Sequence, residues 1–159
     1  MRSRACLYML FALAALSIGI SASAETVDVS TMTTVTFVVS NVSSSTSGSP
    51  NPTTISFSNA QLLTGKALRI SVRADNSSLT PPSGSAIPVS KITWTASGVG
   101  GTAFDGTVSS ASYTQVYRSN ANPGSGSVNI AWSLAAPGSN IRAGDHMVTL
   151  TWMFESVTP

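Results

Sequence analysis

Hydrophobic and polar residues alternate along most of the chain after residue 25, with the period of two that is typical of β-strands. The clearest case is 143–154, where Val148, Leu150, Trp152 and Phe154 would share one side of a strand. No segment keeps a 3.6-residue hydrophobic period over a useful length. The pattern therefore predicts an all-β chain that ends in a strand with one buried face.

About eight short segments with this alternation are predicted to be strands. They lie at residues 27–39, 54–57, 66–75, 89–97, 102–108, 113–119, 126–135 and 143–154. The stretches between them are rich in Ser, Gly, Pro and Asn, which favour turns. The main ones are residues 43–52, 76–88, 119–127 and 136–140. This layout predicts one domain over residues 25–159, an immunoglobulin-like Greek-key β-sandwich of about 7–8 strands.

Each of the three tryptophans follows an aliphatic residue by two positions, so both members of a pair face the same side of a strand. The pairs are Ile92 with Trp94, Ile130 with Trp132, and Leu150 with Trp152. We expect these indoles to lie in or at the edge of the layer between two sheets. The alternative is a row of exposed tryptophans that stack on sugar rings.

Residues 1–24 have the features of a signal peptide. Arg2 and Arg4 precede a hydrophobic run at 5–20, and small residues follow at 21–24. We predict cleavage after residue 24, which leaves 135 residues (159 minus 24) and no membrane span. The expected location is secreted, periplasmic or at the cell surface; the alternative is an uncleaved N-terminal anchor.

The chain after the signal peptide is close to neutral and has no cysteine. Of eight basic residues, Arg2 and Arg4 leave with the signal peptide, so six basic residues face six acidic ones. No basic stripe remains to bind nucleic acid. Without Cys6, thiol catalysis, cysteine metal sites and disulfides are excluded, and we predict no cofactor. Asn41 and Asn76 begin N-glycosylation sequons, which matter only in a glycosylating host.

His146 is the only histidine and the one candidate for a general base. Asp145 precedes it, but neighbouring side chains on a strand point to opposite faces, and no G-x-S-x-G motif occurs. We therefore predict no catalytic residue and no metal site, with His146 on the surface where its strand starts. A hydrolase would instead require His146 within hydrogen-bond reach of a serine and a carboxylate.

The ending "NIRAGDHMVTLTWMFESV" and the polar first strand resemble those of small secreted bacterial sandwich proteins of the spore-coat-U and fimbrial-subunit type. The resemblance implies a non-enzymatic structural role, in which the N-terminal strand of one copy completes the sheet of another. Many such subunits carry a disulfide, which this chain cannot form after cleavage. Within residues 26–40 the candidate strand-exchange positions are Val27, Val29, Val35, Phe37 and Val39. The alternative is an ordinary first strand that pairs within its own domain.

The sequence thus favours an exported structural or cell-surface assembly protein, whose partners are itself or other surface subunits. The alternative function is a sandwich module that binds a glycan or another surface ligand. Tyr113 and Tyr117 are the candidate residues for stacking on that ligand.

Overall fold

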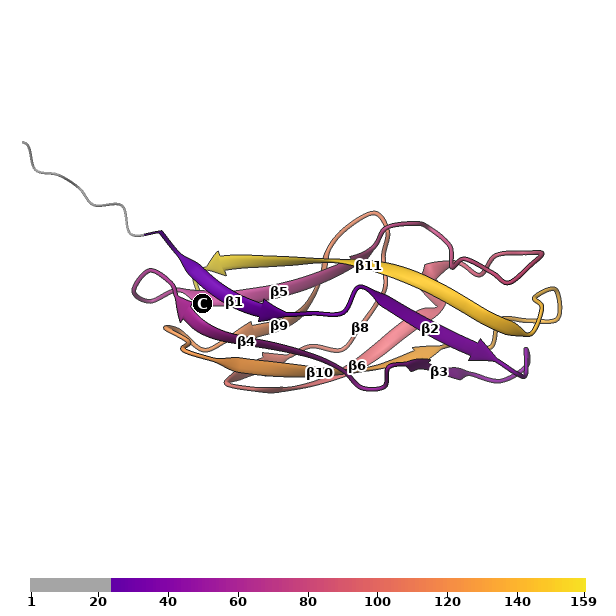
Figure 1. Cartoon of the computed structure of the whole chain (residues 1–159), viewed down its shortest axis with the longest axis horizontal. Coiled ribbons are helices and arrows are strands. Elements are labelled where there is room, and N and C mark those ends of the chain that lie inside the picture. The colour runs from indigo at the N-terminus through magenta and orange to yellow at the C-terminus, as the bar shows by residue number, and fades with distance from the viewer. Residues whose placement is uncertain (1–23) are drawn as a thin grey trace, which may run out of the picture.

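The computed structural model describes residues 24–159, so the predicted signal peptide lies outside the described residues except for Ala24. Within them the regular structure consists of antiparallel β-strands and one short 3-10 helix. Figure 1 shows an elongated sandwich, with β11 and β5 along one side and β10 and β6 along the other. The prediction of an all-β, sandwich-like chain is confirmed.

The described residues form eleven strands rather than about eight. They are β1 (Thr26–Ser30), β2 (Thr34–Val39), β3 (Thr46–Ser49), β4 (Thr53–Gln61), β5 (Ala67–Ala74), β6 (Ile92–Val99), β7 (Gly101–Ala103), β8 (Gly106–Thr107), β9 (Thr114–Ser119), β10 (Gly126–Leu134) and β11 (Gly144–Val157). The 3-10 helix η1 (Val89–Lys91) precedes β6. Two of the predicted segments are each split into two strands, and β3 lies in a stretch that was predicted to be a turn.

The strands form two layers. In the first, which we call the β10 sheet, the order is β1-β4-β10-β6-β8. In the second, the β11 sheet, the order is β2-β11-β5-β9-β7. The short strand β3 pairs with both β10 and β2, and it therefore joins the two layers along one side.

The N-terminal segment changes sheets partway along its length. β1 pairs with β4 in the β10 sheet, whereas β2 pairs with residues 144–149 of β11. Residues 31–33, between them, form no strand, although the Leu150 amide donates to the Thr33 carbonyl at 2.7 Å. Beyond that point β11 pairs only with β5, within the described residues.

The buried hydrophobic side chains form one cluster between the layers. Trp94 and Trp132 are both buried, and their rings meet edge to face with centroids 5.6 Å apart. Trp152 packs against Trp132 at 6.5 Å and is only partly buried. Each buried indole N–H has a partner: Trp132 donates to the Thr53 hydroxyl and Trp94 to the Phe104 carbonyl, both at 2.8 Å. The prediction that the tryptophans belong to the inter-sheet layer is confirmed.

Both ends of the described chain lie at the same end of the molecule (Figure 1). The Ser156 hydroxyl, near the end of β11, donates to the Glu25 carboxylate, just before β1, at 2.8 Å. β2 ends and β11 begins at the opposite end of the sandwich.

Candidate functional site

The two N-terminal strands are held very differently. In β2 the inward side chains of Val35, Phe37 and Val39 are at most 1% exposed. In β1, four of the five residues are exposed; Val27 is partly buried and Val29 is 36% exposed. Among residues 24–159 β1 pairs only with β4, and its register is interrupted between Thr26 and Asp28. Of the five candidate strand-exchange positions, the three in β2 are therefore fixed by burial in the core. The two in β1 are partly buried or exposed and are held weakly.

An opening lies between β1 and the last part of β11, and we call it the β1–β11 seam. β11 residues 152–156 pair with β5 on one side, and β1 pairs with β4 on one side. Within residues 24–159 no strand pairs with the other edge of either segment. Two side-chain hydrogen bonds span the seam instead, from Trp152 Nε1 to the Met32 carbonyl at 2.7 Å and from Ser156 Oγ to Glu25 at 2.8 Å. Unpaired edges of this kind are templates for another strand.

A hollow of about 220 Å³ lies at the end of the seam. Its hydrophobic lining includes Val27, Leu62, Leu68 and Phe154. Because ligand pockets usually enclose about 300–1,000 Å³, this volume suits one or two side chains of a strand better than a cofactor.

Glu25 holds the seam closed at the hollow. Its carboxylate accepts a 2.8 Å hydrogen bond from the Leu63 amide and another from the Ser156 hydroxyl. These bonds, the Leu63 amide first, lower the pKa of Glu25 below its ordinary value of 4.5. The folded state therefore favours the ionised carboxylate.

Acidification is expected to release this contact. Because the folded pKa of Glu25 is lowered, its stabilising contribution is complete above pH 4.5 and is lost as the pH falls through the folded pKa. In an NMR titration, the Leu63 amide resonance should move with an apparent pKa below 4.5, and Glu25→Gln should abolish that movement. A midpoint of this movement at or above pH 4.5 would contradict the assignment.

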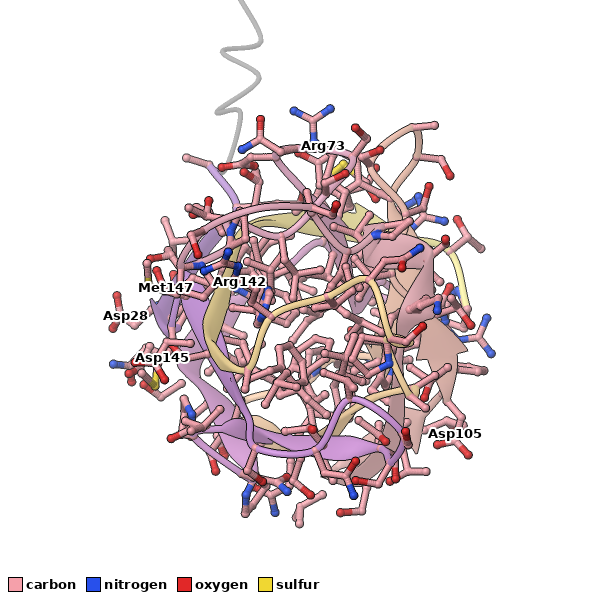
Figure 2. The ribbon with its side chains drawn as sticks, turned by 90° about the vertical axis from the view of Figure 1, so that its right-hand side faces the viewer. Asp28, Arg73, Asp105, Arg142, Asp145 and Met147 are labelled. Carbon is pink, nitrogen blue, oxygen red and sulfur yellow. The ribbon has the colours of Figure 1, made fainter. Side chains whose placement is uncertain are left out.

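Exposed hydrophobic side chains are concentrated on the N-terminal segment and on β11. Four of the six large hydrophobic residues that are exposed lie on the N-terminal segment or on β11: Val29, Met32, Val38 and Met147. In the β2–β11 pair, Val38 lies opposite Asp145, two positions from Met147. Figure 2 shows Asp145 and Met147 on the same side of the molecule as Asp28 of β1. Only Val29 and Met32 lie beside the free strand edges of the seam, because Val38 and Met147 belong to the paired part of β2 and β11 at the other end of the sandwich. The seam therefore combines free strand edges with two exposed hydrophobic groups, as interaction surfaces do.

The prediction that His146 lies on the surface is wrong. His146 is fully buried, because it shares the inward side of β11 with Val148 and Leu150. Its Nε2 lies 2.9 Å from the Arg142 carbonyl, and Nδ1 has no hydrogen-bond partner among the described residues. No serine hydroxyl or carboxylate bonds to the ring within residues 24–159, so this histidine has no catalytic partners there.

The two tyrosines proposed for ligand stacking lie in different environments. Tyr117 is fully buried, its ring packs on Phe57 at 5.9 Å, and its hydroxyl donates to the Val99 carbonyl. This burial raises the pKa of Tyr117. Tyr113 is partly exposed, but the Arg73 guanidinium lies 5.1 Å from its ring centroid. The two rings therefore do not form a joint stacking platform.

The acidic residues are dispersed, and most of them bond to nearby groups of the fold. Asp105 accepts from the Ala96 amide at 2.8 Å, Asp28 accepts from Asn59, and Asp75 accepts from Thr151. The Glu155 carboxylate forms an ion pair with Arg69 at 2.9 Å. In the described part of the chain, no three His, Cys, Asp or Glu side chains lie close enough to hold a metal ion.

Comparison of the chain with protein-family profiles, with curated proteins and with solved structures gave no match. Among residues 24–159 there is no helix with the length and hydrophobicity needed to cross a membrane.

Proposed function

We propose that this chain is an exported, non-enzymatic structural subunit that assembles at the cell surface by exchange of strand β1. The observation that carries the proposal is the weakly held β1, with one free edge along the β1–β11 seam. The resemblance of the chain ending to spore-coat-U and fimbrial-type subunits supports the same role.

The exchanged segment is β1 alone, because β2 contributes too much to the core. Burial of a Val or Phe side chain stabilises by about 1.5–3 kcal/mol, so withdrawal of Val35, Phe37 and Val39 would cost about 5–9 kcal/mol. Such a loss approaches the whole stability of a typical domain, about 5–15 kcal/mol. β1 has no fully buried side chain, and its release withdraws only the partly buried Val27 from the edge of the core.

Exchange would reuse contacts that the chain already makes. β1 of one copy would leave its own β4 and pair with β4 of the next, while residues 31–33 serve as the hinge. Because the same strand pairing forms between copies, the cost of opening is offset on assembly, as in other strand swaps. The exposed Val29 and Met32 would then lie at the new contact.

The proposed architecture is a single domain, a variant of the immunoglobulin-like Greek-key sandwich. Its support is the N-terminal segment that divides between both sheets and the last strand, β11, that returns beside β2. The single buried cluster supports the assignment of one domain.

Deletion of residues 25–30 tests the proposal. We expect the shortened chain to stay folded and to remain monomeric by light scattering at concentrations where the chain beginning at residue 25 forms oligomers. Val38→Lys, which changes an exposed hydrophobic group on β2, is the matched control and should leave β1-dependent oligomers in place. Loss of folding on the deletion, or a full-length chain that stays monomeric throughout, would refute β1 exchange.

A disulfide trap shows where β1 goes. Ser30 and Ser56 are exposed and lie directly opposite each other in the β1–β4 pair, and the chain after residue 24 has no other cysteine. Oxidation of Ser30→Cys/Ser56→Cys should close a bridge within one chain when dilute, and should link chains into covalent oligomers when assembled. If no covalent oligomers form at any concentration, β1 stays paired with β4 of its own chain.

A further inference from the structure

Apart from Asp28 on the edge strand β1, the outer face of the β10 sheet carries no charge on its strands. β3, β4, β6, β8 and β10 contain no Asp, Glu, Lys, Arg or His, and their outward positions are mostly Ser, Thr, Asn and Ala. Sheet surfaces exposed to water are usually dotted with charges that prevent association. A neutral face across four neighbouring strands therefore indicates a specific use.

The scarcity of charge in the whole chain does not explain this face. Arg69, Arg73, Arg118 and Glu155 all lie on strands of the β11 sheet. Arg69 lies opposite both Glu155 and Arg118 in the strand register, so charge is concentrated on the other sheet. Asp105, between β7 and β8, lies at the margin of the molecule in Figure 2, and its carboxylate accepts from the Ala96 amide of β6.

The outward side chains form regular rows across the strands. Thr54 of β4, Asn129 of β10 and Ser97 of β6 make one row, because each is the register partner of the next. Ala131 and Thr95 form the adjacent row. Neighbouring strands are about 4.8 Å apart and rows about 6.7 Å apart, so the face presents a flat grid of short hydroxyl and amide groups.

A shallow hollow of about 330 Å³ lies in the middle of this grid. Ala131, whose side chain is a single methyl group, lies between Pro52 on one side and Thr95 on the other. The Thr54 hydroxyl donates to Asn129 Oδ1 at 2.7 Å, which fixes the carboxamide and leaves its two N–H donors for a ligand. The volume is at the lower limit of small-ligand sites, about 300 Å³.

We propose that this face binds a neutral polysaccharide chain, with one sugar ring in the hollow. The ring's C–H groups would lie against Pro52 and Ala131, and its hydroxyls would bond to Asn129, Thr95 and Ser97. Nucleic acids and charged polymers bind through opposite charge, which this face does not have. Sugar hydroxyls both donate and accept, as the serine and threonine hydroxyls here do.

A second copy stacked on this face is the competing occupant, and its area is too small. Four strands and four rows cover roughly 500 Å² by the strand spacings, against about 800 Å² per partner in a stable interface. A polysaccharide needs less buried area on each copy of the protein, because many copies assembled at one surface bind the same polymer chain together. The inference does not depend on β1 exchange, since a single copy carries the whole face.

Calorimetric titration of the chain from residue 25 with hydroxyethylcellulose, dextran and anionic alginate tests the inference. We expect binding to at least one of the two neutral glucans and none to alginate. Ala131→Lys, which fills the hollow and adds a charge, should weaken that binding at least tenfold, and the nearly isosteric Asn129→Asp should also weaken it. Thr149→Lys adds the same charge at an exposed position of β11 and should leave binding unchanged.

Three results would overturn the inference. They are no binding to either neutral glucan, equal losses in Ala131→Lys and Thr149→Lys, and an Ala131→Lys variant whose main change is a smaller mass in solution. The last result would mean that the face stacks on a second copy. The chain that lacks residues 25–30 keeps the whole face and is expected to be monomeric. The same titration on that chain therefore makes failure here distinct from failure of β1 exchange.

Discussion

Replacement of Trp132 by alanine is expected to lower the free energy of unfolding by about 3–5 kcal/mol. Trp132 is buried at the centre of β10, with Trp94 on one side and Trp152 on the other. Removal of the Trp132 side chain leaves a cavity between the two sheets, and the indoles of Trp94 and Trp152 each lose an aromatic contact. A loss of this size is a large part of a typical total of about 5–15 kcal/mol.

Urea denaturation followed by far-UV circular dichroism measures this loss without reliance on tryptophan fluorescence. Trp132→Phe is the control, because it keeps most of the ring volume and removes the hydrogen bond to Thr53. Thr53 keeps its bond to the Pro50 carbonyl, so we expect a smaller cost of roughly 1–3 kcal/mol. Equal losses in the two variants would show that packing between the sheets contributes little.

Replacement of Phe37 by alanine is expected to cost about 3–5 kcal/mol as well. Phe37 is fully buried in β2, where it lies opposite His146 of β11 and Gly48 of β3. The ring therefore packs where β2 meets both neighbouring strands, and a cavity there would loosen all three.

The matched control is Val29→Ala in β1, where the side chain is 36% exposed and the loss should stay within about 0.5 kcal/mol. The difference between the losses in Phe37→Ala and Val29→Ala measures how much more β2 contributes to the free energy of unfolding than β1. If Val29→Ala cost as much as Phe37→Ala, β1 would be part of the core, and exchange of β1 alone would be untenable.

Most strands could be predicted from alternation because their inward residues are large. β5, β6, β10 and the first half of β11 bury the residues that the pattern assigns to the core. β3 has no such pattern: it reads Thr-Ser-Gly-Ser, and its inward residue is Gly48. A Cβ at Gly48 would lie 2.8 Å from Trp132 Cβ and from Val35 Cγ1, so only glycine allows this strand to join the two layers. A strand whose inward residue must be glycine gives no hydrophobic signal.

The error at His146 has a different cause. The alternation of β11 already places His146 on the side of Val148, but a histidine at the start of a strand is usually solvated. The burial comes from the loop before β11, where the Arg142 carbonyl lies against the ring. Likewise, Leu79 and Ile87 are buried within the predicted loop at 76–88, where the Leu79 amide donates to the Ile87 carbonyl. Irregular segments have no hydrophobic periodicity, so the contacts that they make cannot be predicted from the sequence pattern.

The candidate surfaces were only partly accessible to sequence reasoning. The alternation in residues 26–40 indicated a segment able to pair as a strand, but it could not show that only β1 is weakly held. That difference follows from the change of sheet at residues 31–33, which leaves β1 without a buried face. The neutral face required the register of four strands, which brings Thr54 beside Asn129 across 75 positions of sequence.

The closeness of Glu25 and Ser156 makes the chain a candidate for circular permutation, which proteins tolerate when their ends meet. A short linker from Pro159 to Glu25 would turn β1 into an internal element that follows β11. New ends could then be cut in the exposed loop at 82–86. Such a rewired chain would keep the neutral face and deny β1 the free end that it needs to leave, which yields a building block that can bind but cannot polymerise.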